Sequence, residues 1–76
     1  MTSHVLRIAG REPVLVADAR DAMPHLWRAG VRLADTVLVD GREMLGGEVM
    51  ARAAEKHGDK EAAKRYRKRT KEAAKR

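Results

Sequence analysis

The sequence contains no cysteine and no phenylalanine, and it has one tryptophan, one tyrosine and two prolines among 76 residues. Without cysteine the chain can form no disulfide, thiolate nucleophile or thiolate zinc site, so its fold depends on packing alone. No stretch approaches the roughly 18 apolar residues of a membrane span, and the first residues lack a signal-peptide pattern, so we expect an intracellular, cytoplasmic protein without membrane contact. A chain of this length forms one small domain at most. It has no room for a catalytic cleft and its supporting shell, so we do not expect an enzyme.

Positive charge is concentrated in the last third of the chain. Residues 1–50 carry six arginines, no lysine and seven acids, whereas residues 51–76 carry eleven bases and four acids. Large apolar residues show the opposite distribution, because only alanines and Tyr66 follow Met50. Burial of apolar surface stabilises a fold by roughly 25 cal/mol per Å². We therefore predict a small core domain, residues 1–57, and a basic helical C-terminal extension, residues 58–76.

Two short hairpins are expected in the first 45 residues. Apolar alternation over 4–9, a turn-forming segment and a short apolar run over 14–17 predict the first hairpin. The apolar run 36–39 is followed by Asp40-Gly41, a dipeptide favoured in type I′ turns, which predicts the second. Residues 42–45 could equally begin a helix.

A helix is expected between the two hairpins. Asp18 or Asp21 can serve as its N-cap, and Gly30 is placed to end it. A cap at Asp21 puts Pro24 in the first turn, where its missing N–H costs nothing, whereas a start at Asp18 puts a kink at Pro24. We expect Trp27 to anchor this helix in the core, because it follows Leu26.

The C-terminal half predicts two further helices with a break between them. Gly46-Gly47 is expected to separate the second hairpin from a helix over 48–57. A single straight helix over 48–76 would place apolar residues and lysines on the same side, which cannot be both buried and charged. Gly58 suits a helix end and Asp59 suits the next N-cap, so we predict a break at Gly58.

An eleven-residue repeat dominates the last segment. Residues 60–65, KEAAKR, recur unchanged as 71–76. Eleven residues make three helical turns, so the copies align along one helix of about 25 Å. This helix has one cationic side and an opposite side of small residues that allows close approach to another helix. The cationic side comprises Lys60, Lys64, Arg67, Lys68, Lys71 and Lys75; the small side comprises Ala62, Ala63, Tyr66, Thr70, Ala73 and Ala74.

These features predict a small α+β protein in which β-hairpins pack with short helices and a basic C-terminal helix follows. The basic helix is expected to bind the phosphates of DNA or RNA, with arginines adding bidentate contacts and Tyr66 stacking on a base of a single strand. The candidate nucleic-acid-binding residues are Lys60, Lys64, Arg65, Tyr66, Arg67, Lys68, Arg69, Lys71, Lys75 and Arg76.

Other functions remain open from the sequence. The charged helix could dock on an acidic protein surface, as in a small regulator or inhibitor, or it could be an inert solvated spacer. The chain could also be a structural component of a nucleoprotein or capsid-like assembly. A core this small makes a homodimer a further alternative. Three histidines without metal-ligand spacing give no reason to expect a metal or a cofactor.

Overall fold

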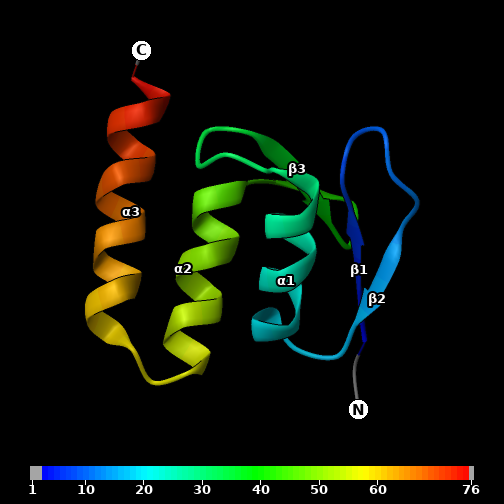
Figure 1. Ribbon diagram of the computed structural model, residues 1–76, viewed down its shortest axis with the longest axis horizontal. Helices are drawn as coiled ribbons and strands as arrows, with labels where there is room; N and C mark the ends of the chain where they lie inside the picture. Colours follow the sequence, from blue (N-terminus) through cyan, green and yellow to red (C-terminus); the bar gives the residue numbers. More distant parts are fainter. Residues whose placement is uncertain (1–2, 76) are drawn as a thin grey trace.

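The computed structural model describes residues 3–75, which form an antiparallel sheet and three helices (Figure 1). This architecture confirms the predicted α+β class, with small hairpins, short helices and a C-terminal helix that is the longest. The strands are β1 (His4–Arg7), β2 (Val14–Val16), β3 (Thr36–Val39) and β4 (Arg42–Leu45), and the helices are α1 (Ala19–Ala29), α2 (Gly46–Lys56) and α3 (Lys60–Ala74).

Both predicted hairpins are present and join into one sheet of order β2-β1-β3-β4, with every neighbouring pair antiparallel. Asp40 and Gly41 both have positive φ, 53° and 80°, as a type I′ turn requires. Residues 42–45 therefore form a strand, and the helix begins only afterwards, at Gly46.

Asp40 links the second hairpin to the first. Its backbone N–H donates to Val5 O at 2.9 Å, and its Oδ1 accepts from the Val5 N–H at 2.9 Å. Its Oδ2 lies 2.6 Å from Nδ1 of His4. The hydrogen bond with His4, and then the one with the Val5 N–H, hold the pKa of Asp40 below its usual value. This turn residue thus fastens β3 and β4 to the first strand.

Helix α1 settles the two possible caps in favour of Asp18. The Arg20 N–H donates to Asp18 Oδ1 at 3.4 Å, and Pro24 lies inside the helix, where it removes one backbone hydrogen bond. Gly30 ends the helix as predicted, with φ of 69° in the left-handed region.

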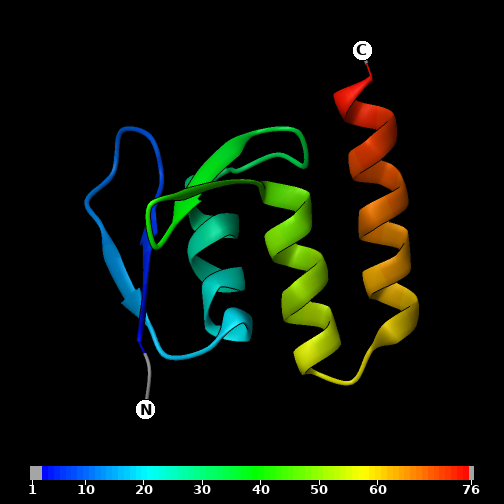
Figure 2. The same cartoon turned by 180° about the vertical axis from the view of Figure 1, so that it is seen from behind.

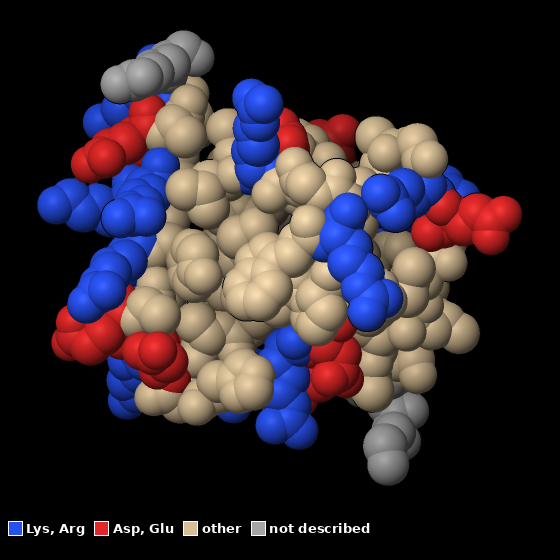
Figure 3. Space-filling view, in the orientation of Figure 1, with Lys and Arg blue, Asp and Glu red and all other residues tan. Residues whose placement is uncertain are grey.

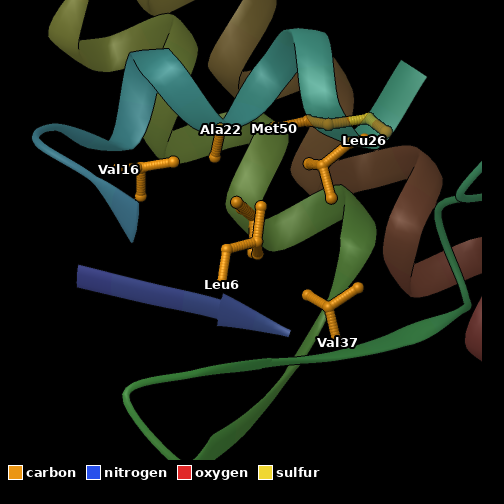
Figure 4. Close-up of a cluster of buried hydrophobic side chains, with 7 residues drawn as sticks. Leu6, Val16, Ala22, Leu26, Val37 and Met50 are labelled. Atoms are coloured by element: carbon orange, nitrogen blue, oxygen red, sulfur yellow. The ribbon is translucent and has the colours of Figure 1, made fainter. Parts of the chain in front are cut away.

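The core lies between the sheet and the first two helices. Figure 4 shows side chains from β1, β2, β3, α1 and α2 converging there. Leu26 of α1 is fully buried and lies beside Met50 of α2 in this view. The buried cluster consists of Leu6, Val16, Ala22, Leu26, Val37, Val49 and Met50.

The prediction that Trp27 anchors the core is wrong, because its residue surface is 64% exposed. The inward stripe of α1 is formed by Ala22 and Leu26, which are four residues apart and both buried. Trp27 is rotated by about 100° from Leu26, which takes it out of that stripe. Of these two large apolar residues of α1, only Leu26 contributes to the core.

The three helices lie side by side, with α2 between α1 and α3 (Figures 1 and 2). The sequence predicts that Gly46 and Gly47 separate β4 from α2. In the structure they instead form the first residues of that helix, and both are buried. A Cβ at Gly46 would lie 2.5 Å from Arg32 O, and a Cβ at Gly47 would overlap Thr70 of α3. These glycines thus permit close packing where a larger residue would not fit.

Candidate nucleic-acid interface

Helix α3 begins where the sequence predicts. Helix α2 ends at Lys56, and Gly58 then adopts a φ of 79° that turns the chain back on itself. Asp59 caps the next helix, since its Oδ1 accepts from the Ala62 N–H at 3.0 Å. The cap fixes the start of the basic helix relative to α2.

The small side of α3 packs on α2 and holds the helix against the rest of the protein. Ala63 and Thr70 of α3 are buried, at 1% and 3% exposure, and Ala51 and Ala54 form a cluster with Ala63. The Thr70 hydroxyl donates to Tyr66 O at 2.5 Å, so its polar atom is satisfied inside the interface. The contact is one of short side chains, which lets the helix backbones lie close together.

The packing leaves the predicted lysines and arginines of α3 at the surface. Tyr66 differs, because it is half-buried and packs against both hydrophobic clusters. Arg76 lies outside the described residues. The exposed candidates are Lys60, Lys64, Arg65, Arg67, Lys68, Arg69, Lys71 and Lys75.

The cationic residues of α3 form two groups on either side of the packed face. One group consists of lysines that are four or seven residues apart, and it lies on the same flank of the helix as Arg67. Arg65 and Arg69 form the other group, next to Tyr66. Between them Lys68 is accompanied by Glu61 and Glu72, so positive charge is densest on the flanks. The first flank comprises Lys60, Lys64, Lys71 and Lys75.

Two cations of α2, which are not among the candidate residues predicted from the sequence, extend the first flank. Arg52 and Lys56 are exposed and, together with Arg67 of α3, line a cavity of about 720 Å³. Their spacing of four residues on the exposed side of an amphipathic helix was the available signal. Three acids reduce the local charge: Asp18 lines the same cavity, Glu48 lies near Arg52, and Glu55 forms an ion pair with Arg67 across the helix interface.

The same cavity reaches the inner face of the sheet. Its apolar walls include Leu6, Val39 and Met44 from the strands and Val49 from α2. A smaller cavity of about 300 Å³ lies between α2 and α3 and is lined by Arg52, Arg67 and Lys71 among others. Both openings place guanidinium and ammonium groups at the junction of the two helices.

Seen from the helical side, charged side chains surround a centre formed by other residues. Figure 3 shows Lys and Arg side chains gathered along α3, while the centre of the same face carries no charged side chain. This centre lies over the packed part of the helical layer, as comparison with Figure 1 shows.

No protein-family model matches the sequence, and neither a search of curated proteins nor one of solved structures found a match. Within residues 3–75, no helix combines the length and hydropathy needed to cross a bilayer. In the same residues, no three His, Asp or Glu side chains come together as metal ligands would.

Proposed function

We propose that this protein binds nucleic acid through the phosphates, using the exposed cationic side chains of α3. The observation that carries the proposal is the division of that helix: Ala63 and Thr70 are buried where the helix packs on α2, and the predicted lysines and arginines within the described residues are all exposed. Because α3 is packed on α2, its charged side chains start from a backbone whose position is fixed relative to the rest of the protein. A solvated spacer has no need of such packing.

The spacing of the charges also suits a polyanion. Lysines four residues apart are separated by about 6 Å along the helix axis, and the stripe from Lys60 to Lys75 extends for about 22 Å. Each phosphate that a lysine or arginine neutralises releases counterions, so affinity falls with salt. With five phosphate contacts, the slope of log K against log salt is about −4.5.

The test is a salt titration of the full chain with random-sequence DNA and RNA, followed by fluorescence anisotropy. Replacing Lys64, Lys68, Lys71 and Lys75 with Gln should reduce the slope by roughly 3.6, at about 0.9 per lost contact. The matched control replaces Arg7, Arg11, Arg32 and Arg42 with Gln, which gives the same net charge but leaves α3 intact.

The two variants separate the alternatives. Equal weakening of both would indicate that net charge alone drives the interaction and would contradict a role for α3. If the full chain bound neither nucleic acid at low salt, the cationic helix would instead serve an acidic protein surface or an assembly. We also propose a cytoplasmic location, because the chain has no cysteine and its fold therefore needs no oxidising compartment.

A further inference from the structure

Trp27 is the sole tryptophan of the chain, and it is 64% exposed although it lies on a helix that supplies the core. Large aromatic side chains bury 150–250 Å² in a typical core, so leaving one in water forgoes a substantial stabilisation. Neither of the two buried hydrophobic clusters includes this side chain. An exposed tryptophan on an ordered helix is therefore free to bind something else.

The surroundings of Trp27 place it on the helical face. Met23, four residues earlier on the same flank of α1, is half-buried and packs against the cluster that contains Leu26 and Met50. His25, on the opposite flank, lines a cavity with Ile8 and Val14 of the first hairpin. The flank of Trp27 is thus turned away from that hairpin.

The other aromatic side chain of the chain, Tyr66 of α3, packs against the cluster that Met23 of α1 contacts. Tyr66 is half-buried and packs against the cluster of Leu26 and Met50 as well as the alanine cluster. The helix between the two aromatics, α2, carries only small or buried residues toward α3 and α1, and the centre of the helical face is free of charge (Figure 3). The face therefore combines the exposed Trp27 and the half-buried Tyr66 with a centre that carries no charged side chain.

Cations border this surface. Arg69 follows Tyr66 by three residues, and Arg65 precedes Arg69 by four, so both lie on the flank of α3 nearest Tyr66. A ligand that fits must present flat uncharged groups toward the aromatics and negative charge toward the arginines. Unpaired nucleotides do so, because every base has an exposed π face and a phosphate alongside. In a duplex the base faces are stacked on one another and are not accessible to a side chain.

We propose that Trp27 is a base-stacking residue and that the preferred partner is single-stranded nucleic acid, with bases on the helical face and phosphates on Arg65 and Arg69. This inference rests on the proposed nucleic-acid function and adds the strandedness of the partner and a contact residue outside α3.

The experiment uses the fluorescence of Trp27 itself. Titration of the full chain with a 20-nucleotide oligothymidylate should quench the emission, whereas a hairpin duplex of equal phosphate number should leave it nearly unchanged. Anisotropy of labelled oligonucleotides then compares variants. We expect Trp27→Ala to weaken oligothymidylate binding by roughly 5- to 150-fold, the range for loss of one stacked base, and to change duplex binding by less than about twofold.

Two further variants sharpen the test. Trp27→Phe keeps an aromatic face and should restore most of the affinity. Leu15→Ala removes another exposed apolar side chain, 73% exposed on the sheet, and should have no effect. Circular dichroism of each variant checks that the fold is retained.

Failure of this inference is distinguishable from failure of the proposed function. Salt-dependent binding without quenching, or equal loss of single-strand and duplex affinity in Trp27→Ala, would overturn the stacking role and leave phosphate binding by α3 in place. Absence of any binding would overturn both. A Trp27→Ala variant that loses only self-association in sedimentation would show the face to be an interface between copies, which also overturns the inference.

Discussion

Asp40 combines a conformational and an electrostatic role in one residue. It adopts the left-handed φ of the type I′ turn, and its carboxylate accepts hydrogen bonds from the first strand. These bonds lower the pKa of Asp40 in the folded protein relative to the usual value of 3.8, with the hydrogen bond to His4 as the largest cause. A carboxyl group with a lowered folded pKa stabilises the fold above its unfolded pKa.

The stabilisation by Asp40 should therefore depend on pH in a defined direction. It is complete above about pH 5 and is lost as the pH falls below about 4 through the lower folded pKa. In Asp40→Asn, which tolerates the same turn conformation, this part of the pH dependence should be missing. Urea unfolding at pH 6 and pH 3 would measure it, with Glu43→Gln as the matched loss of a carboxylate. If the difference in unfolding free energy between the wild-type protein and Asp40→Asn stayed constant down to pH 3, Asp40 would not be the source of this pH dependence.

Single residues also show where the sequence was informative. Asp40-Gly41 and Gly58 were predicted because positive φ strongly restricts which residue types are favourable at these positions. Trp27 was not, because hydrophobicity indicates that a residue is stabilised by burial but does not say which side of a helix faces the core. Leu26 and Trp27 are adjacent in sequence, and only the position of α2 and the sheet decides between them.

Helices α2 and α3 approach each other most closely at a glycine of α2. Gly47 lies in the first turn of α2 directly against Thr70, and a Cβ at Gly47 would overlap the Thr70 hydroxyl. We expect Gly47→Ala to destabilise the protein by about 1–3 kcal/mol through overpacking, despite the better helix propensity of alanine. Chemical denaturation at constant pH measures this change.

Adding Thr70→Ala to Gly47→Ala should recover part of the loss, because Oγ1 and Cγ2 of Thr70 are then removed and only its Cβ remains, at 2.9 Å. The matched control is Glu48→Ala at the exposed neighbouring position, which should change stability by less than about 0.5 kcal/mol. A neutral or stabilising Gly47→Ala would show that the two helices separate there at little cost.

At the scale of elements, the sequence predicted the helices and hairpins better than the contacts between them. The eleven-residue repeat, the cap at Asp59 and the break at Gly58 are local signals, and each appears in the structure. Gly46 and Gly47 were interpreted as a separator because glycine disfavours helices in isolation. Their actual role depends on residues 32 and 70, which are distant in sequence, so no local pattern could show it.

The candidate site was predictable in composition but not in extent. Charge density alone located the basic residues of α3 and the small residues that oppose them. The contribution of Arg52 and Lys56 depends on how α2 lies beside α3, and the ion pair of Arg67 with Glu55 depends on the same arrangement. The role of these four residues follows from tertiary structure.

For the whole molecule, α3 contributes both surface charge and buried contacts. With its C-cap Lys75 it carries eight of the sixteen exposed Lys and Arg side chains within residues 3–75, and it covers Ala51 and Ala54 of α2 with its own Ala63. The division into residues 1–57 and 58–76 is a prediction about independent folding. It would require that the first part keep its stability when the second is removed.

A chain ending at Gly58 tests this division directly. Removal of α3 exposes the alanine cluster, and at roughly 0.8 kcal/mol per buried CH₂-sized group the loss of three methyl contacts amounts to about 2 kcal/mol. We therefore expect the truncated chain to unfold at lower urea concentration than the full chain, while the variant with four lysines replaced by Gln, whose side chains are exposed, keeps the midpoint of the full chain. An unchanged midpoint in the truncated chain would instead establish residues 1–57 as an independent domain, and α3 would then contribute charge without stability.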